Sequence, residues 1–251
     1  MFSKTVLTES VWIYLILCLG SGPCCWPTGC GPEDCWQSKI TSTNCENFRM
    51  KIAILISFLM LPCTSAFTQS PDQGATEIQI WTAGGPSIAG GRGDTGVWSA
   101  GLRYGWVLTD LHGPGFLKGR FEYSIDAVPV YLIFQPVNTA YGVGLVPLNL
   151  KWNFTAHRFV VPYMELSGGT LFTTHDVPSG TLVLPHHASS GTSTINFTPS
   201  AAIGFHLLRK CTWTVEARYL HISNAGLSRL NPGVNTFEMR LGVGKFRASK
   251  K

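Results

Sequence analysis

Residues 97–108 read VWSAGLRYGWVL, and apolar side chains take every second position of this stretch. The apolar positions are Trp98, Ala100, Leu102, Tyr104, Trp106 and Leu108. Between them lie Ser99, Gly101, Arg103 and Gly105. Successive side chains of a β-strand point to opposite faces of a sheet, so this alternation predicts a strand with one apolar and one polar face.

The same period of two continues along the chain from residue 67 onwards. In FLKGRFEYSID, the apolar Leu117, Phe121, Tyr123 and Ile125 oppose Lys118, Arg120, Glu122 and Asp126. In residues 146–154, Val146, Leu148, Leu150, Trp152 and Phe154 oppose Asn149, Lys151 and Asn153. Eight such segments are predicted, at about 77–84, 97–108, 115–134, 140–154, 159–174, 194–208, 212–224 and 234–246.

The connections between these segments alternate in length. Long loops are expected near 85–96, 175–193 and 225–233, with a brief one near 135–139 on the same side. Short turns are expected at 109–114, 155–158 and 209–211. One end with long loops and one with tight turns is typical of outer-membrane barrels, and eight strands is the smallest common closure. The predicted fold class is therefore all-β, an eight-stranded antiparallel up-and-down transmembrane β-barrel.

Side-chain size indicates which face points outward. The apolar faces carry bulky aromatic residues that would crowd a narrow interior, whereas glycines interrupt the polar faces. The interior is predicted to hold Arg103, Lys118, Arg120, Glu122, Asp126, Glu216, Arg218, Glu238 and Arg240. The apolar face then meets lipid. The alternative is a soluble, lipocalin-like barrel, in which the two faces would be reversed.

Composition narrows the class of protein further. Charged residues make up 13% of the chain, and the mean hydropathy is +0.15. No run of about 18 apolar residues follows residue 67, so a helical membrane protein is not expected. The net charge of +5 comes from scattered basic residues, so we expect no nucleic-acid partner.

The first part of the chain differs from the rest, because seven of the eight cysteines lie at or before Cys63. Their spacing lacks the paired C-x2-C pattern of zinc ribbons, and we expect neither a metal nor a cofactor. Residues 50–66 are predicted to be a secretory signal peptide, with Lys51 before the apolar IAILISFLML and small residues after it. Residues 1–49 are then an over-extended N-terminus, and residues 67–251 form the barrel. An alternative leader begins near VWIYLILCLG.

Two stretches could carry chemistry. The glycine-rich GGPSIAGGRGD at 84–94 is not followed by a predicted helix, so we interpret it as a flexible extracellular loop and not a phosphate-binding one. The second is YLHISNAGLSRLNPGVN, residues 219–235. There His221 and Ser223 continue the apolar, outward face of the strand, and Asn235 lies on the same face of the last strand. Polar side chains on a lipid-facing surface cost free energy, so this trio calls for a functional reason.

HISNAGL followed by NPGVN resembles the signature of the outer-membrane lipid A 3-O-deacylases, the PagL family. The close match covers about fifteen residues, 221–235. The resemblance implies an eight-stranded barrel with a histidine, serine and acid triad on its outer surface. On this resemblance Ser223 is the nucleophile and His221 the general base. Asn224 and the backbone N–H of Gly226 are candidates for binding the oxyanion.

The third member of the triad departs from the family pattern. Asn235 stands where a glutamate is expected, and strand parity points Glu238 inward. An asparagine can orient an imidazole but cannot neutralise an imidazolium.

The first hypothesis is thus an outer-membrane serine esterase that removes an ester-linked (3-O) acyl chain from lipid A. Its partners would be lipopolysaccharide of the outer leaflet and the membrane of a Gram-negative bacterium, with the site on the outer-leaflet side. The sequence leaves a homodimer open. The alternatives are a non-catalytic outer-membrane barrel (structural, adhesive or a narrow pore) with a decayed triad, and a soluble ligand-binding barrel.

Overall fold

The computed structural model describes residues 70–155, 159–179 and 192–248. The predicted signal peptide and the extension before it lie outside these residues. In the described part of the chain, no helix has the length and apolar content needed to cross a membrane.

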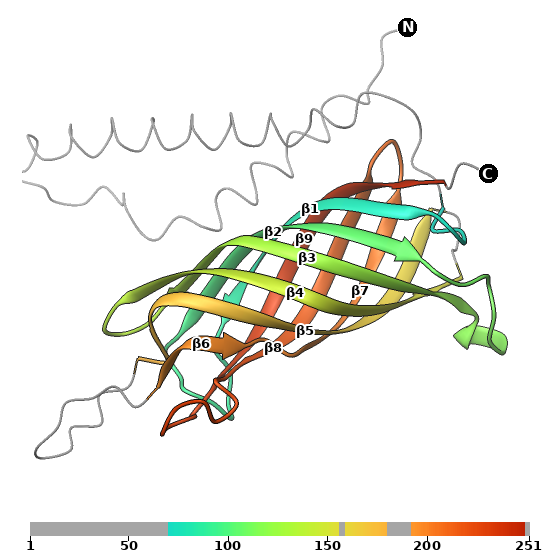
Figure 1. The fold of residues 1–251 in the computed structure, drawn as a ribbon. Coiled ribbons are helices and arrows are strands. Elements are labelled where there is room, and N and C mark those ends of the chain that lie inside the picture. The colour runs from blue at the N-terminus through green and yellow to red at the C-terminus, as the bar shows by residue number, and fades with distance from the viewer. Residues whose placement is uncertain (1–69, 156–158, 180–191, 249–251) are drawn as a thin grey trace, which may run out of the picture. The chain divides into compact units, whose positions relative to one another are not determined.

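The described residues form a single antiparallel sheet that closes on itself (Figure 1). The elements are β1 (Thr76–Pro86), β2 (Gly96–Val107), the short 3-10 helix η2 (Gly115–Leu117), β3 (Gly119–Phe134), β4 (Thr139–Phe154), β5 (Val160–Val177), β6 (Ser193–Phe197), β7 (Ser200–Leu208), β8 (Thr212–Ile222) and β9 (Val234–Arg247). β1 pairs with both β2 and β9, and β4 pairs with β5, which completes the barrel.

β6 and β7 share one position in the barrel wall. β6 pairs with β5 between Thr170 and Val177, and β7 pairs with β5 from Val160 to Ser167. The break between them contains Pro199, which has no N–H to donate to a neighbouring strand. The described wall therefore has eight strand positions, and the prediction of an eight-stranded antiparallel barrel is confirmed.

The outer surface is apolar, as side-chain size predicted, and most charged side chains of the strands point inward. Leu102 is 52% exposed, whereas its neighbour Arg103 is 2% exposed. Exposed aromatic residues include Trp98, Tyr104, Trp213, Tyr219 and Phe237. A soluble barrel would bury these rings inside and expose the charges. The soluble alternative is therefore wrong.

Two residues face differently from the prediction. Val146 was expected outside with Leu148, but it is buried, because the β4–β5 register shifts between Leu145 and Leu148. A bulge adds a residue to one strand, so the alternation of sides changes across it. Lys118 was expected inside but is exposed, because it precedes the start of β3 and the strand alternation does not reach it.

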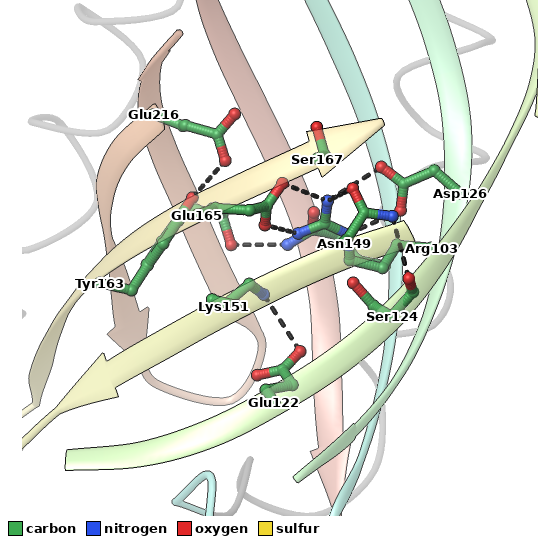
Figure 2. A network of polar contacts seen from close by, with 12 residues as sticks. Arg103, Glu122, Ser124, Asp126, Asn149, Lys151, Tyr163, Glu165, Ser167 and Glu216 are labelled. Atoms are coloured by element: carbon green, nitrogen blue, oxygen red, sulfur yellow. Dashed lines mark hydrogen bonds and ion pairs between the residues drawn. The ribbon is translucent and has the colours of Figure 1, made fainter. Parts of the chain in front are cut away.

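The lumen is filled by a network of charged side chains (Figure 2). Arg103 lies at its centre and binds Asp126 at 2.7 Å and Glu165 at 2.6 Å. Further contacts join Arg218 to Glu165 and Glu216, Arg240 to Asp126, Lys151 to Glu77 and Glu122, and Tyr163 to Glu216. Lumen glycines make room for these side chains: a Cβ added to Gly204 would come 2.7 Å from the Tyr163 ring.

Toward the end of the barrel that carries the β1–β2 and β8–β9 loops, the lumen changes character. There a buried apolar cluster replaces the charges: Trp81, Ala83, Val97, Val128, Tyr131, Ile133, Ala140, Val146, Leu171, Val177, Leu220, Ile222 and Val234. The sequence analysis did not predict it. Ion pairs and apolar side chains are thus both buried in the described lumen.

Candidate active site

His221 and Asn235 face each other across the β8–β9 pair, close to the loop that joins these strands. They are direct cross-strand partners, and His221 Nδ1 lies 2.6 Å from Asn235 Oδ1. The next pair on the same face, Tyr219 and Phe237, is exposed, whereas the adjacent inward pair, Leu220 and Thr236, is buried. His221 and Asn235 therefore lie on the outer face of the barrel, as strand parity predicted.

The contact between the two side chains has a chemical consequence. An amide oxygen is an acceptor only, so a hydrogen bond to Asn235 Oδ1 requires that His221 Nδ1 carries the hydrogen and donates it. A neutral ring then leaves Nε2 without a hydrogen and able to accept a proton. This is the ring form that a general base uses when Nδ1 is bound by an orienting group.

Ser223 lies one residue beyond β8 and two residues beyond His221. Its N–H and C=O pair with Phe197 of β6, at 3.1 and 2.7 Å, so the backbone here is still extended. Residues two apart on a strand share a face, which places Ser223 beside His221. Within the described residues no hydrogen bond joins the Ser223 hydroxyl to the His221 ring, and Ser223 is 8% exposed.

The chain reverses immediately after Ser223 in a tight turn. Leu227 N donates to Asn224 O at 3.0 Å, and the two central residues, Ala225 and Gly226, have φ of 50° and 83°. Positive φ at both central positions is the mark of a type I′ turn, which glycine adopts without strain. The turn leads directly out of the strand that carries His221.

The two predicted oxyanion donors take part in bonds within this loop. Gly226 N donates to Asn224 Oδ1 at 2.9 Å, and Asn224 Nδ2 donates to Leu230 O at 2.8 Å. An amide nitrogen carries two hydrogens. Asn224 Nδ2 thus has a second hydrogen that the Leu230 bond does not use. Gly226 N–H would have to give up its hydrogen bond to Asn224 Oδ1 before it could donate to an oxyanion.

The β1–β2 loop covers the outward side of Asn235, which is only 6% exposed. Ile88 N donates to Asn235 O at 2.8 Å, and Arg92 N donates to Gly233 O at 2.9 Å. This is the glycine-rich stretch that was predicted to be a flexible extracellular loop. Its backbone is bonded to the start of β9, beside the candidate site.

Two further residues of the site were missed from the sequence. Asn231 Oδ1 accepts a hydrogen bond from Asn224 N at 3.0 Å and so holds the two ends of the β8–β9 loop together. Gly233 has a φ of 66°, and a Cβ there would come 2.9 Å from His221 Cε1. The Asn-Pro-Gly triplet at 231–233 was a visible signal, because such triplets mark turns with special backbone angles.

Glu238 points into the lumen, as predicted, and is buried beside Thr236. It cannot reach the outer face to replace Asn235 as the partner of His221. The residue that orients the imidazole in this structure is therefore an uncharged amide.

The chain that carries this outward histidine and amide matches a known protein family. The model of a family described as lipid A 3-O-deacylase (PagL) matches residues 98–244, more than half of the chain. The chain belongs to the lipid A 3-O-deacylase (PagL) family. The resemblance inferred from HISNAGL and NPGVN is thus confirmed, and the match spans β2 to β9. His221, Ser223 and Asn235 all lie within the part of the chain that matches the PagL model.

Three solved structures are similar to this chain. The crystal structure of the outer membrane enzyme PagL is 18% identical, with a TM-score of 0.47, covering 65% of this chain and 97% of that chain. OprG from Pseudomonas aeruginosa is 11% identical, with a TM-score of 0.41, covering 71% and 98%. Ail of Yersinia pestis is 13% identical, with a TM-score of 0.39, covering 70% and 99%. A comparison with curated proteins found no match.

Proposed function

We propose that this chain is a serine esterase that hydrolyses the 3-O-linked acyl chain of lipid A. Membership of the PagL family supports the substrate class. The observation that carries the mechanism is the 2.6 Å contact between His221 Nδ1 and Asn235 Oδ1 on the outward face of the barrel. It leaves Nε2 of the same ring as the proton acceptor for Ser223.

The position of the site on the barrel fits a lipid substrate. His221 and Ser223 lie at the end of β8, next to the β8–β9 loop and beside exposed apolar residues such as Tyr219. If the N-terminus of the barrel is periplasmic, the β8–β9 loop is extracellular, since eight antiparallel strands place alternate connections on opposite sides. The site then lies near the outer-leaflet interface, where the ester linkages of a glycolipid are found.

The first step forms an acyl-enzyme. His221 Nε2 takes the proton of the Ser223 hydroxyl while Oγ bonds to the ester carbonyl carbon, and the carbonyl oxygen becomes an oxyanion. Asn224, through its second amide hydrogen, is the proposed donor to that oxyanion, with Gly226 N–H as the other. The bond between the acyl carbon and the sugar oxygen then breaks, and the imidazolium gives its proton to the leaving 3-hydroxyl.

The second step releases the fatty acid. Water attacks the acyl carbon on Ser223, and His221 takes a proton from that water. When the bond to Oγ breaks, the proton returns to Ser223, and the carboxylic acid leaves. Asn235 holds the ring in the same orientation throughout, because Oδ1 accepts from Nδ1–H in both the neutral and the protonated ring.

Mass spectrometry of lipid A tests the proposal. The barrel is expressed in the outer membrane of a host that makes lipopolysaccharide, and the expected result is the loss of one hydroxyacyl chain. Ser223→Ala should abolish this loss, a reduction of at least about a thousandfold, because the nucleophile is gone. Ser228→Ala is the matched control: its hydroxyl lies in the same loop but binds Thr192 O. Unmodified lipid A in a host carrying the folded wild-type barrel would refute the esterase.

One rival function has an observation in its favour. Asn235 is an amide where the family resemblance implies an acid, which would fit a barrel whose triad has decayed. Replacing the acid by its amide in a serine protease lowers turnover about 10⁴-fold. Such a barrel would serve a structural or adhesive role. A narrow pore is disfavoured, because Arg103, Lys151 and their carboxylate partners fill the lumen and are almost wholly buried.

A further inference from the structure

We infer that the backbone of Gly90 and Gly91, in the β1–β2 loop, is a positioning element of the site that holds Asn235 against His221. This inference rests on the proposed function for its catalytic meaning. Its structural content is independent of it, and it assigns a role to a loop on the opposite side of β9 from the histidine and serine.

The loop is fixed to the start of β9 on both sides of the two glycines. Before them, Ser87 pairs with Thr236, and Ile88 N donates to Asn235 O at 2.8 Å. After them, Arg92 N donates to Gly233 O at 2.9 Å. The intervening backbone therefore has to run along the Gly233–Asn235 segment.

The two glycines are in close contact with Asn235. A Cβ added to Gly91 would come 2.9 Å from Asn235 N and 3.3 Å from Nδ2, and one added to Gly90 would come 3.0 Å from Nδ2. The backbone can come this near only because neither residue has a side chain. The side-chain amide of Asn235 thus lies between two groups: its nitrogen is next to the β1–β2 loop, and its oxygen is next to the His221 imidazole.

This enclosure has two effects on the His221–Asn235 pair. It removes water from the amide, and a hydrogen bond in a dry environment is stronger than one in water. It also limits the rotation of the Asn235 side chain, so the oxygen stays within reach of Nδ1. Gly233 closes the other side, next to His221 Cε1.

The enclosure also limits which residue can occupy position 235. Glutamate is one methylene longer than asparagine, and that extra length would have to fit between the imidazole and the Gly90–Gly91 backbone. The short amide at position 235 and the close approach of the β1–β2 loop are therefore matched to each other. Aspartate has the size of asparagine and would fit the same space.

Gly91→Ala tests the inference, with Gly93→Ala as the matched control. The new methyl group at 91 collides with the Asn235 backbone, whereas a Cβ at 93 meets nothing within 4 Å. In the folded barrel labelled with ¹⁵N-histidine, the wild type and Gly93→Ala should show the His221 hydrogen on Nδ1. Gly91→Ala should show a mixture of the two ring tautomers. It should also lower kcat by about tenfold to a hundredfold with KM unchanged.

If Gly91→Ala does not fold, Arg92→Pro carries the same test, since it removes the N–H that binds Gly233 and adds no atom against Asn235. A wild-type tautomer and a wild-type kcat in the folded variant would overturn the inference. The two proposals fail separately. Without any deacylation by the wild type, the tautomer still decides the positioning role. With deacylation equal in wild type and Gly91→Ala, the esterase stands and the positioning role falls.

Discussion

The lumen and the outer-face site both hold polar side chains of the barrel wall. These side chains differ in how many hydrogen-bond and ion-pair partners they have. In the lumen, Arg103 makes charged hydrogen bonds to two carboxylates, each of which has a second cationic partner in Arg240 or Arg218. On the outer face, His221 has one side-chain hydrogen-bond partner among the described residues, and that partner is neutral. Buried charges that are fully paired serve the fold. Polar groups on an apolar face with unused bonding capacity do not stabilise the fold in this way, and for that reason we propose a functional role for them.

Arg103→Met removes the central cation of the lumen network and should have the largest effect. It leaves Asp126 and Glu165 with one cation each in a dry interior, and removing one partner of a buried ion pair costs about 3–5 kcal/mol. We expect that loss in the free energy of unfolding, measured by urea denaturation in detergent or lipid bilayers. Arg229→Met, in the exposed β8–β9 loop, is the control and should change it little. Deacylation per folded molecule should be unchanged, and a loss of it would mean that the two regions are coupled.

Leu102→Arg places a charge on the lipid-facing side, next to the position where a charge is required. An arginine near the middle of the bilayer costs a transmembrane barrel about 2–4 kcal/mol, and less toward its ends. Leu108→Arg, just beyond the end of β2, should therefore cost about 1 kcal/mol or less. Folding into bilayers measures both. Equal costs at the two positions would contradict the assignment of the outer face to lipid.

Asn235→Asp replaces the neutral partner of His221 in the outer-face site, and its expected effect is the smallest. A carboxylate of the same size fits between the imidazole and the β1–β2 loop and stabilises the imidazolium formed during attack. We expect kcat/KM to rise about tenfold, equivalent to about 1.4 kcal/mol.

Two further results would bear on the role of the amide at position 235. A fall in activity would show that the neutral amide is the working group in this enzyme. Asn235→Glu, which the sequence alone would favour as a restoration of the family pattern, should perform worse than Asn235→Asp. The longer side chain has to displace the loop, and an equal or better result would contradict the enclosure described above.

Much of the wall could be predicted from the sequence, because alternation and side-chain size act locally. Trp98 and Arg103 are assigned to opposite faces by parity, and the number of bulky rings on the apolar face assigns that face to the outside. Trp81 is an exception, because its ring is buried in the lumen. Val146 shows where this fails: Pro147 has no N–H, and the bulge around it changes the side on which Val146 points. A proline within a strand was a usable signal.

The site could be predicted only in part, for a physical reason. His221, Ser223 and Asn235 are brought together by strand register, which follows from the alternation. The packing of the β1–β2 loop on Asn235 depends on contacts between residues far apart in sequence. Gly91 and Gly93 look alike in the sequence, yet a Cβ at position 91 would meet Asn235, whereas a Cβ at position 93 would meet nothing within 4 Å.

The apolar cluster around Trp81, Tyr131 and Ile133 has a consequence for any fatty-acyl chain that reaches His221. Apolar protein side chains are buried in that end of the described lumen, and the His221–Asn235 pair lies on the opposite, outer face of the wall. The tail would lie along the outside of the barrel among its bilayer neighbours. If the proposed esterase prefers one acyl-chain length, that preference would then depend on the outer wall and the surrounding lipid, and not on the lumen.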